Sequence, residues 1–308
     1  MDEFELISTF VSQFDVAPPP RGPGDDCAVL PKQGPSCVTT DALVEGVHFT
    51  RRAFSMDDVG HKALAVNLSD LAAMGARPAW FTVALGLPDW VTARHVNAMS
   101  AGMARLARLH GVELIGGNVT RASQLSLTLT LSGALDGPPL LRSGARPGDA
   151  LYLSGPVGDA ATGLSILSTN PSARSPLVDA QRRPVPHVAF GRFARSRCSA
   201  AIDVSDGLAQ DLGHLCRASG VGADLDSSAL PMSPALLDRA GSRKAAQACV
   251  LSGGEDYVLL VAVRDPPAFE RALTRSGFEA WRVGTLRKGS GVNLDGVRLT
   301  GRLGFMHR

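Results

Sequence analysis

The sequence predicts a two-domain α/β protein. Segments typical of helices alternate with short apolar segments typical of strands along most of the 308 residues. Proline and glycine cluster between Asp136 and Pro147, a composition typical of a boundary between domains. A chain of this length with 44% apolar residues can supply two cores of ordinary size. We therefore expect one domain at residues 1–138 and a second at 139–308.

The first domain is expected to interleave helices with strands. Apolar spacing predicts helices, at residues 1–14, 57–74 and 92–109. Apolar runs and period-two alternation predict strands, at residues 37–43, 80–85, 112–115 and 125–131. Asp57 or Asp58 is the expected cap of the second helix, and Gly111 the expected terminator of the third. Asn67 and Asp70 stand three residues apart and therefore share one face of the second helix.

The second domain repeats this alternation. Helices are expected at residues 159–167, 187–195, 207–218 and 266–276. Strands are expected at 150–153, 200–204 and 257–263, with further short strands in the last part of the chain. Residues 168–186 are rich in Pro, Ser and Arg and are interpreted as an exposed loop.

Charge and cysteine content exclude several classes of protein. The net charge is +2 and no long basic run is present, which argues against a nucleic-acid partner. The five cysteines are scattered and form no Cys-x-x-Cys pair, as expected of free thiols in the cytoplasm rather than of a zinc site or disulfide framework. The acidic N-terminus does not resemble a secretion signal, and no apolar run reaches the length of a membrane span.

Oxygen-bearing side chains recur where strands or helices are expected to end. The runs lie at Gly24–Asp26, Thr39–Asp41, Asn67–Asp70, Gly116–Asn118 and Asp203–Gly207. Any one run is most simply an Asx-turn or a helix cap. Their recurrence favours a site for hard divalent cations such as Mg²⁺, which join carboxylates to substrate phosphates. The sequence therefore predicts metal-dependent phosphate chemistry.

Other candidate groups leave two interpretations open. Gly155–Gly158 and Gly253-Gly254 are either turns or cradles for phosphate, and neither has the Walker A or Gly-x-Gly-x-x-Gly pattern. Ser205 is either a nucleophile or a hydrogen-bonding group. Arg142 either holds a phosphate or is a solvated surface residue, and His48 either lines the cleft near Asp41 or is an ordinary surface histidine.

Seven segments together resemble the thiamine-monophosphate kinase family in order and spacing. They are residues 24–28, 39–49, 62–76, 115–121, 142–149, 202–208 and 251–257. The most specific are Lys62–Ala76 and the run Ser-Gly-Gly-Glu-Asp-Tyr at Ser252–Tyr257. The resemblance implies the two-domain fold of aminoimidazole-ribonucleotide synthetase. In that fold the N-terminal sheet pairs across a homodimer, with 125–131 as the expected edge strand, and the C-terminal domain covers the nucleotide.

The resemblance also implies a reaction and a set of site residues. ATP and thiamine monophosphate would give ADP and thiamine diphosphate, with several Mg²⁺ ions. Metal-binding positions match Asp26, Thr39, Thr40, Asp41, Asp70, Asn118, Asp203 and Asp206, of which Asp41, Asp70 and Asp206 are the expected catalytic residues. ATP-contacting positions match Gly117, Asn118, Arg142 and Ser205. Positions that hold the acceptor substrate match His48, Glu255 and Phe305.

The chain departs from the family at two of these positions. Asn118 stands where the family commonly has Asp, so it is expected either to bind a metal through its neutral oxygen or to contact the nucleotide through its amide. Phe305 lies in an altered C-terminal sequence, where an aromatic ring could still stack on the substrate.

The expected chemistry requires positioning more than proton transfer. A phosphate oxygen of the acceptor is already anionic, so the obstacle is bringing two anions together, and charge neutralisation by bound metal addresses it. Direct transfer then gives Ser205 a binding role. Two rival functions stay open: an ATP-dependent synthetase of the same fold acting on a ribonucleotide amide or on selenide, and a non-catalytic nucleotide-binding module. Cys27, near the position of the reactive residue in selenide enzymes, is interpreted as a packing residue.

Overall fold

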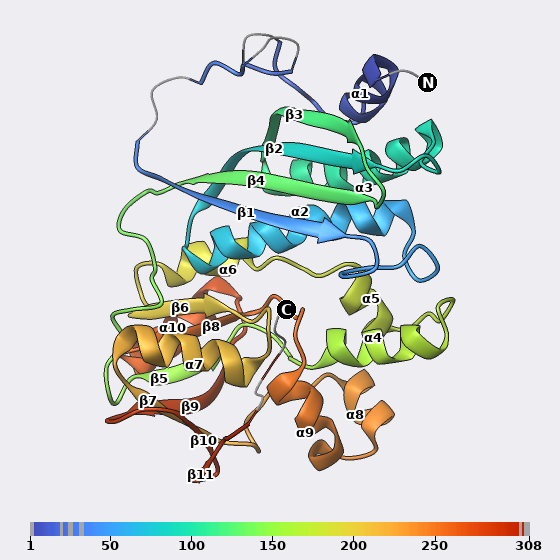
Figure 1. Cartoon of the computed structure of the whole chain (residues 1–308). Helices are drawn as coiled ribbons and strands as arrows, with labels where there is room; N and C mark the ends of the chain where they lie inside the picture. Colours follow the sequence, from blue (N-terminus) through green and yellow to red (C-terminus); the bar gives the residue numbers. More distant parts are fainter. Residues whose placement is uncertain (1–2, 19–20, 24–26, 31–33, 302–303, 305–308) are drawn as a thin grey trace. The chain divides into compact units, whose positions relative to one another are not determined.

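A computed structural model describes residues 3–18, 21–23, 27–30, 34–301 and 304, and the chain divides into two compact units (Figure 1). Unit 1 comprises Met1–Leu71 and Ala76–Asp136. Unit 2 comprises Ala72–Gly75 and Gly137–Arg308. The boundary between Asp136 and Gly137 thus falls within the segment rich in proline and glycine.

Unit 1 is built on a sheet that has, among the described residues, four strands in the order β1-β4-β2-β3. The strands are β1 (Ser36–Val44), β2 (Arg77–Leu87), β3 (Glu113–Arg121) and β4 (Ser126–Ala134). Strand β4 pairs antiparallel with both β1 and β2, while β2 and β3 are parallel. The expectation that residues 125–131 form an unpaired edge is therefore wrong. The edges of this sheet are β1 and β3.

One face of this sheet carries the core of unit 1. Helices α2 (Met56–Ala73) and α3 (Ala93–His110) lie against that face (Figure 1). Leu127, Leu129 and Leu131 of β4 are fully buried there, whereas Thr128 between them is exposed on the other face. Because side chains alternate along a strand, the predicted Leu-Ser/Thr pattern separates a buried face from an open one.

The helices of unit 1 begin and end at recognisable caps. Ser55 caps α2, because its hydroxyl accepts from Asp58 N at 3.2 Å and its own N–H donates to Asp58 Oδ2 at 3.2 Å. The expectation of an aspartate at the cap is therefore wrong, since Asp58 is the acidic partner three residues on. Thr92 and Gly111 bound α3 as predicted, with Gly111 at φ 61°.

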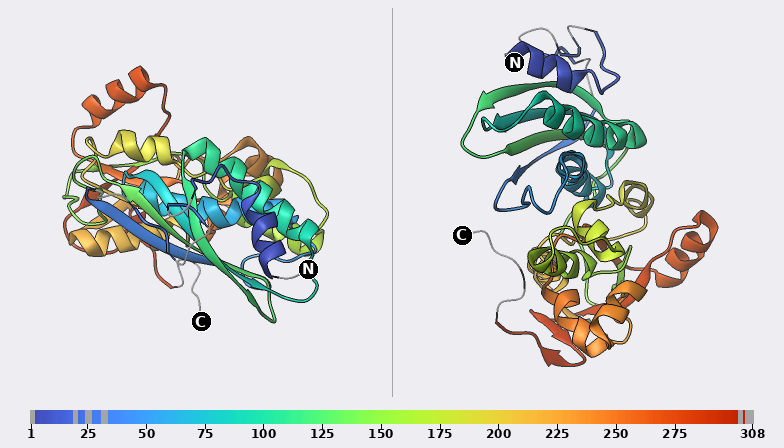
Figure 2. Two further views of the ribbon diagram at one scale, coloured as in Figure 1. Left: turned by 90° about the horizontal axis from the view of Figure 1, so that it is seen from above. Right: turned by 90° about the vertical axis from the view of Figure 1, so that its right-hand side faces the viewer.

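Glycine allows α2 and α3 to pack backbone to backbone. A Cβ atom on Gly60 would lie 1.9 Å from Met99 O, and one on Gly102 would lie 2.0 Å from Asp57 O. Helix α1 (Glu3–Val11) joins this layer beside α3 (Figure 2). Just beyond α1, Gln13 Nε2 donates to Asn97 Oδ1 at 2.9 Å.

Unit 2 is built on a larger sheet, with seven strands among the described residues in the order β11-β10-β7-β9-β5-β8-β6. The strands are β5 (Ala150–Leu153), β6 (Ala200–Asp203), β7 (Gly222–Leu225), β8 (Leu259–Val263), β9 (Trp281–Arg287), β10 (Val292–Leu294) and β11 (Val297–Arg298). Every residue of β5, β6 and β8 is buried. These apolar strands form the centre of the core of unit 2.

Helices flank this sheet. They are α4 (Asp159–Thr169), α5 (Pro176–Arg182), α6 (Val188–Ala194), α7 (Leu208–Ser219), α8 (Pro234–Ala240), α9 (Arg243–Ser252) and α10 (Pro266–Ser276). The expected helices at 159–167, 187–195, 207–218 and 266–276 are confirmed. Within the described part of the chain, no helix combines the length and apolar character needed to cross a membrane.

The segment 168–186 is not a continuous loop, because it contains α5. Ser175 caps this helix by accepting from Val178 N at 3.3 Å, and Pro176 occupies its first turn. Proline is favoured there because the first helical N–H groups have no helical partner. A Ser-Pro pair was therefore the signal of a helix start rather than of a loop.

Candidate active site

In unit 1, strand β1 presents Thr39 and Asp41 toward the helix-covered side of the sheet. They pair in register with Leu131 and Leu129, whose side chains are buried on that side. Thr39 Oγ1 donates to Asp70 Oδ2 of α2 at 2.5 Å. Asp41 Oδ1 accepts from Ala42 N at 2.7 Å. The structure therefore brings Thr39 and Asp70 into contact and places Asp41 on the same face of β1.

Thr40 lies on the opposite face of β1. Its Oγ1 donates to Leu129 O at 2.8 Å and accepts from Thr130 Oγ1 at 3.3 Å. Period-two alternation separates its side chain from those of Thr39 and Asp41. The structure thus does not bring the Thr40 hydroxyl to Asp70, and we leave it out of the site proposed below.

Two further predicted residues, Asn67 of α2 and His48 after β1, bond to the backbone of their own segments. Asn67, one turn before Asp70, is 1% exposed and donates to Ala63 O at 2.9 Å, so it faces the core. Asp70 on the same helix is only half-buried. His48 lies in the turn after β1, where its Nδ1 accepts from Val44 N at 3.1 Å and fixes the shape of that turn.

Gly117 and Asn118 lie within β3 rather than beyond a strand end. The expected strand 112–115 continues through both glycines to Arg121, because β3 pairs with β2 along this length. A Cβ atom on Gly117 would lie 2.2 Å from Val83 O, so only glycine fits this pairing. Both residues line a cavity of about 510 Å³ whose walls are the apolar side chains of α1, β2 and β3.

Cys27 also lines this cavity and is exposed. Its interpretation as a packing residue is therefore wrong.

Two predicted site residues lie outside the described residues. They are Asp26, next to Cys27, and Phe305, near the C-terminus.

In unit 2, the second acidic run forms the turn between β6 and α7. Asp203 ends β6 and is 4% exposed, and Ser205 and Asp206 follow as half-buried residues. Gln210 Nε2 donates to Asp206 Oδ2 at 3.0 Å. Gly207 closes the turn at φ 122°, a backbone conformation that favours glycine.

Asp211 holds this turn from the first turn of α7. Its Oδ2 accepts the backbone N–H groups of Ser205, Asp206 and Gly207 at 3.1, 3.0 and 3.1 Å. Burial raises the pKa of Asp211 to about 7, and the nearby charge of Asp206 also raises it. The sequence interpretation did not single out Asp211, although an acid in the first turn of a helix after Asp-Gly is the pattern of such a contact.

Asp206, Asp211 and His214 form a compact group, with ligand atoms within 4.8 Å of one another. The pKa of His214 is lowered, first by burial and then by the charges of Arg217 and Arg142. Arg142 thus acts electrostatically on the same region, and its backbone O accepts from Ser219 Oγ at 2.9 Å. Ser205 and Asp206 thus lie at the N-terminal end of α7, whereas the backbone of Arg142 lies at its C-terminal end, and the Arg142 charge acts on His214 within the helix.

The Gly253–Tyr257 loop is tied to the acidic turn. Glu255 N donates to Ser205 O at 2.7 Å, and Tyr257 N donates to Val204 O at 2.9 Å. Glu255 Oε2 accepts from Gln181 Nε2 of α5 at 2.5 Å. The loop therefore places Glu255 beside Ser205.

Asp256 links the same loop to the turn before α4. Its carboxylate accepts from Gly158 N at 2.7 Å and from Ala160 N at 3.1 Å, while desolvation raises its pKa to about 7. Gly158 adopts φ 95° in this turn. The stretch Gly155–Gly158 thus has a structural partner for its N–H group, which supports the turn interpretation.

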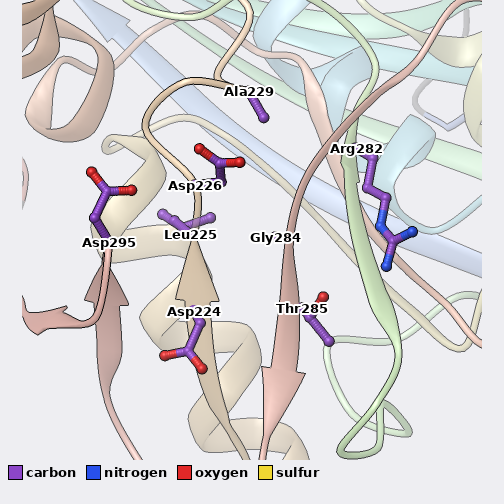
Figure 3. Close-up of a pocket in the computed structure, with 8 residues that line it drawn as sticks. All are labelled: Asp224, Leu225, Asp226, Ala229, Arg282, Gly284, Thr285 and Asp295. Carbon is purple, nitrogen blue, oxygen red and sulfur yellow. The ribbon is translucent and has the colours of Figure 1, made fainter.

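Unit 2 contains a separate cavity of about 380 Å³, which is lined by acidic residues of β7 and of the turns beside it (Figure 3). Asp224 accepts from Arg287 Nε at 3.1 Å and from Asn293 Nδ2 at 2.7 Å. Asp226 and Asp295 accept from the N–H groups of Ser228 and Ser227. Asp226 stabilises the turn that follows β7, whereas Asp224 and Asp295 join β7 and this turn to residues far along the chain. No predicted site residue lies among the lining residues.

The chemistry of the predicted donors fits a hard cation. Asp41, Asp70, Asp203 and Asp206 offer carboxylate oxygen, and Thr39 offers a hydroxyl. Mg²⁺ prefers such oxygen ligands and usually keeps several waters or substrate phosphates in its shell. The residues present therefore fit magnesium better than a soft metal, which would favour thiolate or imidazole.

Both halves of the chain match known families. Residues 24–135 match the family "AIR synthase related protein, N-terminal domain", and residues 146–296 match the corresponding C-terminal domain. The thiamine-monophosphate kinase of Salmonella typhimurium is 43% identical over 274 residues, which is 85% of this chain and 82% of the relative. The predicted fold class is therefore confirmed.

Solved structures agree with this match. The thiamine-monophosphate kinase of Stenotrophomonas maltophilia K279a superposes with a TM-score of 0.85 at 37% identity, covering 96% of each chain. The structure of AaThiL complexed with AMPPCP and TMP superposes with a TM-score of 0.78 at 30% identity, covering 87% of this chain and 85% of that one.

Proposed function

This chain belongs to the thiamine-monophosphate kinase family, and on that premise we propose that it transfers the γ-phosphoryl group of ATP to thiamine monophosphate. The products would be ADP and thiamine diphosphate. The observation that carries the proposal is the pair Asp41 and Asp70, held on one side of β1 in a chain 43% identical to a thiamine-monophosphate kinase. AMPPCP, bound in the related AaThiL structure, is an ATP analogue and supports ATP as the donor.

The carboxylates would serve charge neutralisation. We assign two groups of residues as ligands of Mg²⁺. Unit 1 supplies Asp41, Asp70 and Thr39, together with Asp26, which lies outside the described residues, and unit 2 supplies Asp203 and Asp206. Magnesium, when bound, offsets the repulsion between donor and acceptor phosphates. The Thr39 hydroxyl orients the Asp70 carboxylate by donating to its Oδ2 at 2.5 Å.

The remaining residues would bind and orient the two substrates. We assign ATP contacts to Gly117 and Asn118 of β3 and to Arg142 and Ser205 of unit 2. The acceptor phosphate oxygen is anionic near neutral pH, so the chain needs no general base and no phosphoenzyme. Ser205 then binds rather than attacks, in a backbone held by Asp211.

The acceptor is assigned to three further residues. His48, Glu255 and Phe305 are proposed to contact thiamine monophosphate. The thiazolium ring carries a permanent positive charge, which favours a carboxylate such as Glu255 and an aromatic ring such as Phe305. The cytoplasm is the proposed location, because all five cysteines are free thiols.

Purified protein is expected to convert thiamine monophosphate to thiamine diphosphate with Mg-ATP. Free thiamine is expected to be a poor acceptor because it lacks the attacking phosphate. Chromatography of the products, with ADP release measured in parallel, tests this. ATP turnover only with a ribonucleotide amide or selenide would instead indicate a synthetase, and nucleotide binding without turnover would indicate a binding module.

Asn118→Asp is expected to lower the Mg²⁺ concentration needed for half-maximal activity if Asn118 ligates the metal, because a carboxylate adds a charge to the metal shell. Asn118 is exposed in β3, so stability should change little. If the amide N–H₂ contacts the nucleotide instead, the same variant should raise the ATP requirement. Mg²⁺ and ATP titrations of one variant separate the two roles, and unchanged curves would remove Asn118 from the site.

We propose that the protein is a homodimer in which sheets of unit 1 pair. The open face of this sheet exposes Val38, which is 61% accessible, and also Thr40 and Thr128. Among the described residues, no further strand pairs with the edges β1 and β3, and proteins usually cover such edges. Light scattering at micromolar concentration is expected to give twice the chain mass of 32.2 kDa, and a monomer mass would contradict the proposal.

A further inference from the structure

Gln181 makes an unusual contact for a residue of a short helix. It lies on α5 and is 1% exposed. Its Nε2 donates to Glu255 Oε2 at 2.5 Å across 74 positions of sequence. Its Oε1 is also buried and has no hydrogen-bond partner among the residues that the structure describes.

The Glu255 loop is held in a backbone conformation that ordinary residues avoid. Glu255 has φ 69° and Tyr257 has φ 52°, both in the left-handed region. Gly254 packs so closely that a Cβ atom there would lie 2.4 Å from Ser205 O. Hydrogen bonds from Glu255 N to Ser205 O and from Tyr257 N to Val204 O tie this loop to the acidic turn. Strain of this kind persists where the surroundings define the geometry, and it is common at functional sites.

A packing role alone does not account for glutamine at position 181. Methionine has nearly the same length and shape, and it would fill the same space without leaving a buried oxygen unpartnered. The glutamine retains that unfavourable oxygen and contributes one thing that methionine lacks, a hydrogen bond that directs the Glu255 carboxylate. The backbone hydrogen bonds of the loop fix the position of the Glu255 backbone, and the Gln181 amide fixes the position of its carboxylate.

We propose that Gln181 is a positioning residue that orients the Glu255 carboxylate toward the cationic part of the acceptor substrate. This inference rests on the proposed function, because it takes Glu255 as an acceptor-binding residue. It adds α5, whose segment reads as a loop in the sequence, to the elements that determine acceptor specificity.

Gln181→Met tests the proposal in the full-length protein. The variant should raise the KM for thiamine monophosphate about tenfold, as for loss of a hydrogen bond to a charged group, while the KM for ATP stays within about twofold. Its melting temperature should be unchanged or higher, because the unpartnered oxygen is gone. Gln181→Glu should weaken acceptor binding further, because two carboxylates would face each other. Gln247→Met, at a half-buried glutamine of α9, is the matched control and should leave both constants unchanged.

Calorimetric titration with thiamine monophosphate in the absence of ATP gives a second readout that does not depend on turnover. The dissociation constant should rise in Gln181→Met in parallel with the KM. A lower melting temperature with unchanged acceptor binding, or an equal rise in both KM values, would show a structural role and overturn the inference. If wild-type protein neither binds nor phosphorylates thiamine monophosphate, the proposed function itself fails, and the inference fails with it.

Discussion

Asp41→Asn and Asp70→Asn are each expected to lower turnover about a hundredfold or more while the melting temperature changes by only a few degrees. Each variant keeps the shape of the side chain but removes a charge that would neutralise phosphate in the transition state. Asp41 is exposed and Asp70 is half-buried, so neither charge is needed by the core. Steady-state kinetics with saturating Mg-ATP, together with thermal unfolding, measure both effects.

A matched control for these variants is Asp89→Asn, also in unit 1. Asp89 forms an exposed ion pair with Arg121 at 2.7 Å, and pairs of this kind contribute little to stability. Turnover of this control should equal that of wild type. Near-wild-type turnover in both Asp41→Asn and Asp70→Asn would remove these residues from the active site, whereas a large loss of thermal stability would indicate a structural role.

Asp211→Ala is expected to lower the free energy of unfolding by about 3 kcal/mol or more and to abolish most activity. It removes the acceptor of three backbone N–H groups, and each buried group left unsatisfied costs about 1–3 kcal/mol. The turn that carries Ser205 and Asp206 would then lose its support. Denaturant unfolding and the kinase assay measure the two losses.

Asp211→Asn should be much milder. All three N–H groups donate to the same oxygen, Oδ2, so an amide oxygen in that place can keep all three bonds. Equal damage in the alanine and asparagine variants would show that the charge, rather than the acceptor geometry, is what matters at this position.

The raised pKa of Asp211 also predicts a pH dependence in metal-free buffer. Its folded pKa of about 7 lies above the usual 3.8, so between these values the folded protein holds a proton that the unfolded chain releases. The contribution of this group to the free energy of unfolding therefore falls as pH rises from about 4 to 7. The wild-type protein should lose stability relative to Asp211→Asn across this range, and parallel curves would contradict the assignment.

Local signals in the sequence predicted most helices and their ends. Thr92 and Gly111 bound α3, and Gly277 ends α10 at φ 74°, because cap preferences depend only on residues within one turn. Ordered motifs also indicated the family and its acidic residues. Each position of such a motif requires a residue type with a specific chemical role, so the motif can be recognised from the sequence without coordinates.

Features that depend on distant pairing appeared only in the tertiary structure. Strand β4 lies between β1 and β2, and β3 runs on through Gly117, because partners far along the chain supply the hydrogen bonds. Side chains alternate along β1, so Thr40 and Asp41 point to opposite faces of the sheet. Which face belongs to the site is decided only when helices cover one of them.

The sequence by itself determined the fold class, the family and the acidic residues that belong to it. The tertiary structure decided which groups hold those residues in place. Asp211 supports the acidic turn and Gln181 directs Glu255, although neither stood out in the sequence. Gln181 and Glu255 are 74 positions apart, and no local pattern records a contact that forms only when α5 and the loop after α9 fold against the same core.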